Sequence, residues 1–241
     1  MKRILRLAKN LILSIGLLPD WLSFCRQNNN RFRLGWLDNL PRLKDRTKKT
    51  QFDLHYTYHP AWAARILAKT RPIEHVDFSS SLAFSTIISA FVPVRFFDFR
   101  PADISLSGLT SSQADLNSLP FPASSLDSIS CLHVLEHIGL GRYGDPINPD
   151  GDLKAGKELQ RVLAPGGDLL IAVPVGRPRL RFNAHRIYSF SQIIEMFNQL
   201  ELHEFSLISE KTGQFISPAD PALVSQEKYA CGCFWFKKKK L

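Results

Sequence analysis

Two apolar segments that each contain an acidic residue constrain the fold of this chain more than any other feature. Residues 73–80 (IEHVDFSS) have the pattern of a buried strand, residues 83–91 that of a helix, and residues 94–100 (VRFFDFR) that of a second strand. Asp98 follows Asp77 by 21 residues. An acidic residue about 20 positions after such a strand typically accepts hydrogen bonds from the ribose hydroxyls of a nucleoside. The segment therefore predicts a nucleoside-binding βαβ unit.

The chain from residue 51 to residue 241 continues to alternate strands and helices. This order favours one α/β domain with a mostly parallel sheet of seven strands and helices on both faces. We expect a third strand before Asp115 and a helix that ends at Leu163, followed by a turn at residues 165–167. The other expected helices cover residues 60–69, with Pro60 in the first turn, and 191–200. The other expected strands cover residues 126–134, 168–174, 202–208 and 229–238.

The net charge of +9 raises the question of a nucleic-acid partner. Residues 1–50 contain 12 Lys and Arg against three Asp, which is +9, whereas residues 51–241 contain 19 basic and 19 acidic residues, which is zero. A neutral domain lacks the basic surface that follows phosphates. We therefore expect no nucleic-acid partner.

The basic charge lies in an N-terminal extension, residues 1–50. Residues 1–24 combine four Lys or Arg with a helical stripe of Leu and Ile, and the apolar run is shorter than the roughly 20 residues that span a bilayer. Two interpretations are equally open: the helix lies on an anionic membrane surface, or it packs its apolar face onto the domain. Residues 26–50 are polar and basic and predict an irregular connector.

Four cysteines without a CxxC pair favour a reducing compartment, so we expect a cytoplasmic protein, with peripheral attachment to the inner membrane face as one option. Cys231 and Cys233 are two residues apart in an apolar run and share one face of the expected strand. This spacing favours core packing over metal ligation. The sequence predicts no metal site.

Two longer segments resemble a known family. Residues 113–138 (QADLNSLPFPASSLDSISCLHVLEHI) and 158–174 (ELQRVLAPGGDLLIAVP) are similar to the small-molecule class I S-adenosylmethionine-dependent methyltransferases. The chain also resembles a less characterised bacterial subgroup with HVLEHIGLGRYGDP and FNAHRIYS segments. The resemblance covers residues 60–236 and implies a Rossmann-like methyltransferase fold, an antiparallel last strand between its neighbours, and S-adenosyl-L-methionine as cofactor.

The resemblance also implies roles for individual residues. Asp98 would bind the ribose, Asp115 the adenine amino group, and Leu116 would cover the adenine ring, while His133 would line the methionine side. Glu136 and His137 are equally well explained as structural residues of the turn. The full set of expected cofactor-binding residues is Asp77, Ser79, Ser81, Asp98, Phe99, Asp115, Leu116 and His133.

The first strand departs from the family pattern. Serines at 79–81 stand where the family has a glycine-rich turn, and serine is disfavoured at positive φ. A non-catalytic scaffold that kept the fold as an interaction module is therefore the alternative to an active methyltransferase. An NAD-dependent oxidoreductase also explains Asp98, but the LPFP, LEH and RVLAPGG segments are foreign to that class.

Residues 139–152 and 176–189 follow the fourth and fifth expected strands, so both leave the ligand-binding edge of the sheet and are expected to enclose a substrate pocket. Their arginines favour an anionic small-molecule or lipid-linked acceptor. His137 and His185 are the candidate catalytic bases. The expected substrate-binding residues are Arg142, Tyr143, Arg177, Arg181 and Arg186.

Overall fold

The computed structural model describes residues 15–28 and 31–240 and divides into two compact units, Met1–Phe52 and Asp53–Leu241. In the smaller unit, helix α2 (Leu18–Gln27) is followed by the 3₁₀ turns η1 (Trp36–Asp38) and η2 (Leu43–Asp45). Trp21 packs edge-on against Trp36, with ring centroids 5.2 Å apart, and Arg46 pairs with Asp20. Most of the expected amphipathic helix, residues 1–14, lies outside the described residues. In the part of the chain that the structure describes, no helix is both long and apolar enough to cross a membrane.

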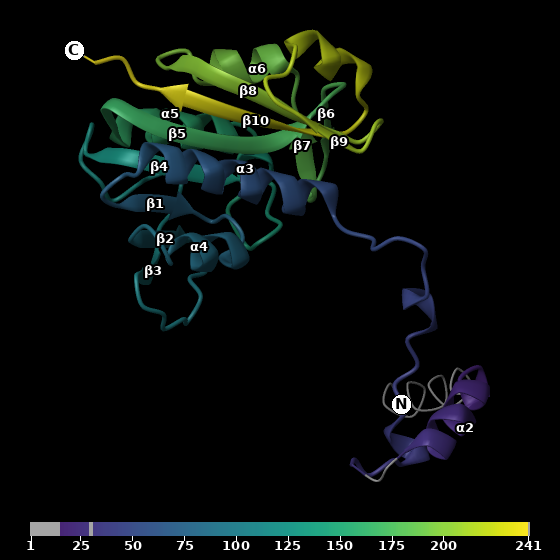
Figure 1. Ribbon diagram of the computed structural model, residues 1–241. Helices are drawn as coiled ribbons and strands as arrows, with labels where there is room; N and C mark the ends of the chain where they lie inside the picture. The colour runs from purple at the N-terminus through teal and green to yellow at the C-terminus, as the bar shows by residue number, and fades with distance from the viewer. Residues whose placement is uncertain (1–14, 29–30, 241) are drawn as a thin grey trace. The chain divides into compact units, whose positions relative to one another are not determined.

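The larger unit is built on a sheet of eight strands in the order β3-β2-β1-β4-β5-β10-β8-β9 (Figure 1). Neighbouring strands from β3 to β5 are parallel, as the sequence predicts for βαβ units. The strands are β1 (His75–Phe78), β2 (Val94–Asp98), β3 (Leu109–Gln113), β4 (Leu126–Leu132), β5 (Leu163–Val175), β8 (Glu201–Ser209), β9 (Gln214–Ile216) and β10 (Ala230–Lys237).

The last strand, β10, runs antiparallel to both of its neighbours, β5 and β8, which confirms the expected methyltransferase topology. The sheet has one strand more than the predicted seven, because β9 turns back along β8 at the edge. Residues 176–189, expected to follow the fifth strand and to enclose a substrate pocket, contain a two-stranded hairpin of β6 (Arg179–Arg181) and β7 (His185–Ile187). Both additions are three-residue strands, too short for a periodic pattern to predict.

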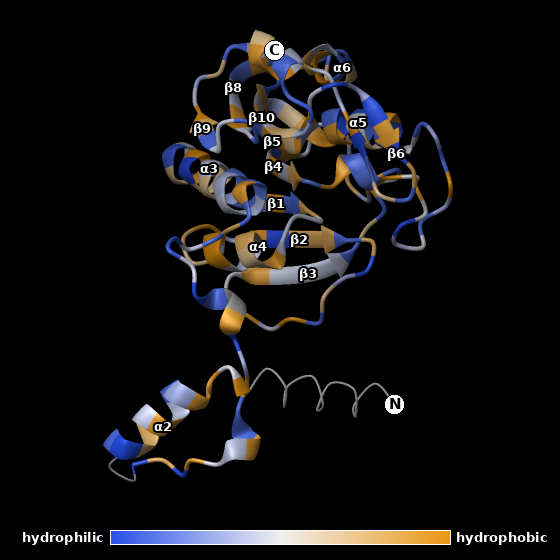
Figure 2. Cartoon of the chain, turned by 90° about the vertical axis from the view of Figure 1, so that its right-hand side faces the viewer, coloured by the Kyte–Doolittle hydropathy of each residue, from blue (hydrophilic) through white to orange (hydrophobic). Residues whose placement is uncertain are grey.

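Two apolar clusters cover the two faces of this sheet. Helices α3 (Leu54–Thr70) and α4 (Leu82–Ile88) pack on the face that carries Leu170 and Ala172 of β5. Helices α5 (Gly151–Val162) and α6 (Phe190–Met196) pack on the other face, which carries the alternate residues Leu169 and Ile171. Burial on both faces explains why residues 169–175 of β5 are continuously apolar, whereas the edge strand β3 is paler in Figure 2.

Helix α3 starts earlier than the sequence predicts. Asp53 caps it by accepting a hydrogen bond from the backbone N–H of Tyr56 at 2.9 Å, and Pro60 lies inside the helix rather than in its first turn. The prediction was wrong because Pro60 was taken as a start signal. A second difference concerns residues 165–167, expected as a turn, which the structure includes in β5.

Candidate functional site

The carboxyl ends of the parallel strands surround a cavity of about 320 Å³, here named the carboxyl-edge cavity. Ser79 follows β1, Asp98 ends β2, Asp115 follows β3 and His133 follows β4, and all four line it. The ends of neighbouring parallel strands meet at one edge of an open sheet, which is where ligands bind in this type of fold. Other expected site residues that line it are Phe99, Leu116, His137 and Tyr143.

The serine-containing turn keeps the backbone conformation that a glycine would provide. Ser79 has a φ of 56°, in the left-handed region, and its hydroxyl donates to the carbonyl of Phe97 at 3.3 Å. Ser80 accepts a hydrogen bond from the backbone N–H of Leu132 at 3.0 Å. The left-handed conformation costs a serine about 1 kcal/mol. The turn nevertheless has the backbone conformation expected of the family's glycine-rich turn at Ser79, although no glycine is present there.

Asp77 and Ser81, two expected cofactor-binding residues, have structural contacts and do not line the cavity. Asp77 is fully buried and accepts hydrogen bonds from the hydroxyl of Ser130 and the backbone N–H of Ser80. Burial raises the pKa of its carboxyl to about 6. Ser81 caps α4 by accepting a hydrogen bond from the backbone N–H of Phe84 at 3.3 Å. These two residues hold the turn in place.

Three acidic residues line the cavity, and two of them, Asp98 and Asp115, each keep one carboxylate oxygen without a hydrogen-bond partner among the described residues. Oδ1 of Asp98 accepts from the backbone N–H of Arg100 at 2.7 Å. Oδ1 of Asp115 accepts from the backbone N–H of Asn117 at 2.8 Å. These bonds fix both carboxylates at the ends of adjacent strands β2 and β3, so that Oδ2 of each is available to hydroxyl or amino groups of a ligand.

His133 is held in a strained position at the end of β4. Its φ is 59°, its backbone N–H donates to the carbonyl of Ala172 at 2.7 Å, and its side chain is nearly buried. Nδ1 donates to Oε1 of Glu136 at 2.7 Å. Burial by itself raises the pKa of Glu136, but the charge and the hydrogen bond of His133 outweigh it and hold that pKa below its usual value.

His137 follows in the 3₁₀ turn η3 (Leu135–His137) and also lines the cavity. Its Nδ1 donates to the carbonyl of Ala184 at 2.5 Å, which leaves Nε2 with the lone pair of a neutral imidazole. Arg142 lies 3.3 Å from the same Nδ1, but because that atom carries a proton the guanidinium donates instead to the carbonyl of Ala184 at 3.2 Å. Burial lowers the pKa of His137. The neutral form is therefore the one present at physiological pH.

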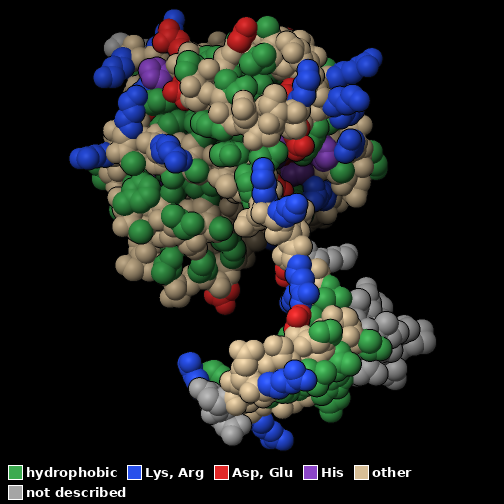
Figure 3. All heavy atoms as spheres, turned by 45° about the vertical axis from the view of Figure 1, so that its right-hand side comes forward, with side chains coloured by type: hydrophobic (Ala, Val, Ile, Leu, Met, Phe, Trp, Pro, Cys, Tyr) green, Lys and Arg blue, Asp and Glu red, His purple; other side chains and the backbone are tan. Residues whose placement is uncertain are grey.

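A pair of arginines flanks the aromatic ring of Tyr143, which lines the cavity. The guanidinium carbons of Arg100 and Arg142 lie 4.7 and 5.1 Å from the ring centroid. On the face of the larger unit seen in Figure 3, histidine side chains lie beside several Lys and Arg side chains. Cationic groups at this position favour an anionic ligand.

The remaining expected residues are placed elsewhere. His185 does not line the cavity, and its ring lies 6.4 Å from that of His137. Arg186 donates to the carbonyls of Ile138 and Pro149 at 2.7 and 2.9 Å and lies 3.4 Å from Asp152. It thereby joins the hairpin to residues 138–152, and it lines a second, more open hollow of about 800 Å³. The exposed Arg177 and Arg181 line neither of these spaces.

The structure adds buried residues that the sequence did not single out. The buried rings of His55 and His59 on α3 lie 5.2 and 5.0 Å from that of His133, and the half-buried Tyr229, just before β10, lies 5.1 Å from His55. The i, i+4 spacing of His55 and His59 was the available signal, since it places both on one helix face. It was missed because the helix was expected to start at Pro60.

Solved structures with the same fold are S-adenosylmethionine-dependent methyltransferases and proteins related to them in fold. A putative methyltransferase from Bacillus halodurans is 16% identical, with a TM-score of 0.56 over 75% of this chain and 99% of that one. The 1,6-didemethyltoxoflavin-N1-methyltransferase of Burkholderia thailandensis, solved with S-adenosylhomocysteine, is 12% identical, with a TM-score of 0.54 over 77% and 81%. The [4+2]-cyclase SpnF is 14% identical, with a TM-score of 0.53 over 76% and 82%. The protein therefore has the class I methyltransferase fold.

Residues 112–229 match a family model described as Caenorhabditis protein of unknown function, DUF268. A comparison with curated proteins gave no match. The matched segment runs from the end of β3 to the start of β10 and includes the turn after β4, the insertion at 139–152 and the β6–β7 hairpin. It thus contains Asp115, His133 and His137.

Proposed function

We propose that this protein transfers a methyl group from S-adenosyl-L-methionine to a small-molecule, sugar or lipid-linked acceptor. The observation that carries the proposal is the carboxyl-edge cavity, where Asp98, Asp115 and the turn at Ser79 meet at the ends of adjacent strands. Asp98 would accept hydrogen bonds from the ribose, and Asp115 from the adenine amino group. Leu116, which is buried, would cover the adenine ring.

The cofactor, when bound, supplies a sulfonium methyl group: the acceptor forms a bond to the methyl carbon while the carbon–sulfur bond breaks and its electron pair stays on sulfur. The protein's own part is to hold the acceptor in line and to take its proton. His137 is the better candidate for this base, because it lines the cavity and its Nε2 has a free lone pair. His185 lies outside the cavity lining and would orient the acceptor at most.

An anionic acceptor fits the arginines near the cavity. Arg100 lines it, and Arg142 also packs on the ring of Tyr143. We also propose that the chain belongs to the subgroup with HVLEHIGLGRYGDP and FNAHRIYS segments, both of which fall inside the matched residues 112–229.

A lipid-linked acceptor would place the protein at the inner face of a membrane, with residues 1–24 on an anionic surface. Within the smaller unit, α2 has no buried residue and exposes Leu18, Leu22 and Phe24, the apolar side chains that such a surface would cover. The proposal predicts that full-length protein sediments with anionic vesicles and that a variant lacking residues 1–24 does not.

The second candidate function is a non-catalytic scaffold with a methyltransferase fold. It is favoured by the serines at 79–81 and by the internal hydrogen bonds that occupy Asp77. The left-handed conformation of Ser79 supports the first candidate instead, because the turn keeps its form without glycine.

Calorimetric titration of the full chain with S-adenosylhomocysteine separates the two candidates. A methyltransferase predicts micromolar binding that Asp98→Ala weakens by about tenfold to a hundredfold, the equivalent of a lost hydrogen bond to a charged group. Asp103→Ala is the matched control, since Asp103 is an exposed acidic residue in the loop after β2 that does not line the cavity. A well-folded wild-type protein that does not bind the ligand would favour the scaffold.

A further inference from the structure

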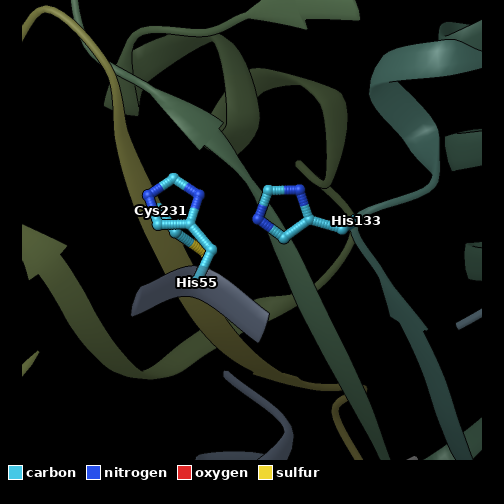
Figure 4. Close-up of side chains that lie close together, drawn as sticks. All are labelled: His55, His133 and Cys231. Atoms are coloured by element: carbon cyan, nitrogen blue, oxygen red, sulfur yellow. The ribbon is translucent and has the colours of Figure 1, made fainter. Parts of the chain in front are cut away.

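Three side chains that can bind a metal meet at one buried point beside the carboxyl-edge cavity. His55 is on α3, His133 follows β4 and Cys231 is on β10, and one ligand atom from each lies within 4.8 Å of the others. Figure 4 shows the two imidazole rings with a nitrogen of each facing the other, and Cys231 beside His55. The three residues are 4%, 7% and 0% exposed, respectively. They come from distant parts of the sequence and converge in an environment with little water.

The hydrogen bonds of His133 leave one nitrogen for a ligand. Its Nδ1 donates to Oε1 of Glu136, while its Nε2 is buried and has no hydrogen-bond partner among the described residues. Buried polar atoms nearly always have a partner, so such an atom needs an explanation. Metal-bound histidines almost always donate their second nitrogen to a carboxylate, a carbonyl or water. The pair of His133 and Glu136 has this arrangement.

His55 has a carboxylate on its far side as well. Its Nε2 lies 3.4 Å from Oε1 of Glu210, a contact that leaves Nδ1 for a ligand. His59 packs against His133 and is fully buried with both ring nitrogens unpaired. The cluster therefore holds more unsatisfied nitrogen atoms than a histidine-containing core normally keeps.

We infer that His55, His133 and Cys231 form a binding site for a divalent transition metal, with Zn²⁺ as the best fit. Two imidazole nitrogens and one thiolate suit Zn²⁺, whereas Ca²⁺ and Mg²⁺ require oxygen ligands. Binding releases the thiol proton of Cys231 to solvent as the sulfur–metal bond forms. This inference departs from the sequence-based expectation of no metal site, which rested on the absence of a CxxC pair and on the core packing expected of Cys231 and Cys233.

Three protein ligands leave a fourth position open, as in catalytic zinc sites, where water or substrate occupies it. His133 belongs both to the inferred metal site and to the lining of the carboxyl-edge cavity. An acceptor in that cavity would therefore lie next to the metal. The metal site itself does not depend on the proposed methyl transfer.

The test is metal analysis of the full chain, followed by titration of the metal-free protein with Co²⁺, which reports ligand type through its absorption spectrum. We expect about one metal ion per chain, the intense visible bands of tetrahedral Co²⁺, and a thiolate-to-cobalt charge-transfer band. Cys231→Ser should abolish the charge-transfer band and weaken binding by at least about tenfold. Cys233→Ser is the matched control, because its sulfur lies 4.0 Å from that of Cys231 on the same strand and is equally buried.

A weak octahedral spectrum of the wild-type protein, or loss of the charge-transfer band in Cys233→Ser but not in Cys231→Ser, would overturn the assignment. If Cys231→Ser does not fold, as judged by circular dichroism, Glu136→Gln takes its place. This variant should bind Co²⁺ about tenfold to a hundredfold more weakly and keep the charge-transfer band, whereas wild-type affinity would contradict the site. Titration of the same samples with S-adenosylhomocysteine keeps the two proposals separate, since either ligand can bind without the other.

Discussion

Nδ1 of His133 lies 2.7 Å from Oε1 of Glu136, and the same oxygen lies 3.7 Å from Nε2 of His137. One fully buried carboxylate thus faces two histidines that line the carboxyl-edge cavity. Its negative charge raises the pKa of His137, in opposition to burial, which lowers that pKa and has the larger effect. Glu136 therefore connects the geometry of His133 to the protonation of His137.

Replacing Glu136 by Gln tests this connection. The substitution removes the charge that raises the pKa of His137, while burial, which lowers that pKa, remains. We expect the His137 pKa to fall further below 6.5, as measured by NMR titration of metal-free protein. Glu210→Gln is the control and should leave this pKa unchanged. An unchanged or raised His137 pKa in Glu136→Gln would show that the charge of Glu136 does not act on His137.

The two candidate bases differ in position and should differ in effect. His137→Gln removes the lone pair that lines the cavity and should slow methyl transfer by about a hundredfold or more, the usual range for a general base. His185→Gln should slow it much less. The assay follows tritiated methyl groups from S-adenosylmethionine into small-molecule and lipid extracts. A larger loss in His185→Gln than in His137→Gln would reverse the two roles.

The buried residues His75 and Asp77 have opposite effects on stability between pH 4 and pH 6. Burial lowers the pKa of His75 from 6.5 to about 3, so as the pH falls only the unfolded chain gains that proton, and stability falls. Burial raises the pKa of Asp77 from 3.8 to about 6, so as the pH falls the folded chain gains that proton first, and stability rises. Each effect is about 1.4 kcal/mol per pH unit, and in the wild type they largely cancel.

Asp77→Asn removes the effect of Asp77 and leaves that of His75. Relative to the wild type, the variant should lose about 1.4 kcal/mol of unfolding free energy for each pH unit between pH 6 and pH 4. Urea denaturation at several pH values measures the difference. Asp127→Asn, at an exposed position in β4, should follow the wild-type curve. Parallel pH curves for Asp77→Asn and the wild type would show that Asp77 titrates as it does in the unfolded chain.

Arg186 should contribute to the stability of the fold rather than to the binding of an anionic substrate. Its guanidinium donates to the carbonyls of Ile138 and Pro149 and lies next to the buried Asp152, so Arg186→Ala leaves a buried carboxylate without its cation. We expect a loss of about 3 kcal/mol in the free energy of unfolding. Arg179→Ala, which removes one exposed hydrogen bond to the carbonyl of Arg177, should change it by less than about 0.5 kcal/mol. Equal effects of the two variants would contradict this role.

The sequence predicted the sheet and its ligand-binding edge because these depend on local patterns. Residues 169–175 of β5, a strand buried on both faces, are continuously apolar, and Asp98 and Asp115 come at strand ends that neighbouring parallel strands bring together. The sequence pattern did not show which residues of the first turn reach the ligand. Ser79 lines the cavity, whereas Asp77 and Ser81 have structural contacts, because the direction of each side chain depends on the conformation of the turn.

The histidine cluster was not predictable in this way. His55, His133 and Cys231 come from α3, the end of β4 and β10, and only the packing of α3 across the sheet brings them together. The role of Arg186 was not predictable either, since its position in the sequence fits a substrate-binding residue. Only the fold shows that it donates hydrogen bonds to the backbone carbonyls of residues 138 and 149. Long-range packing decided both cases.

Hydrogen–deuterium exchange of the full chain, with and without saturating S-adenosylhomocysteine, tests the central claim most directly because it locates the ligand. We expect slower exchange of backbone amides in residues 98–100 and 114–117, which line the carboxyl-edge cavity, and in the turn 79–81, of which Ser79 lines it. We also expect unchanged exchange around the open hollow, at residues 178–180 and 192–199. Unchanged exchange in all three segments, or slower exchange only around the open hollow, would contradict it.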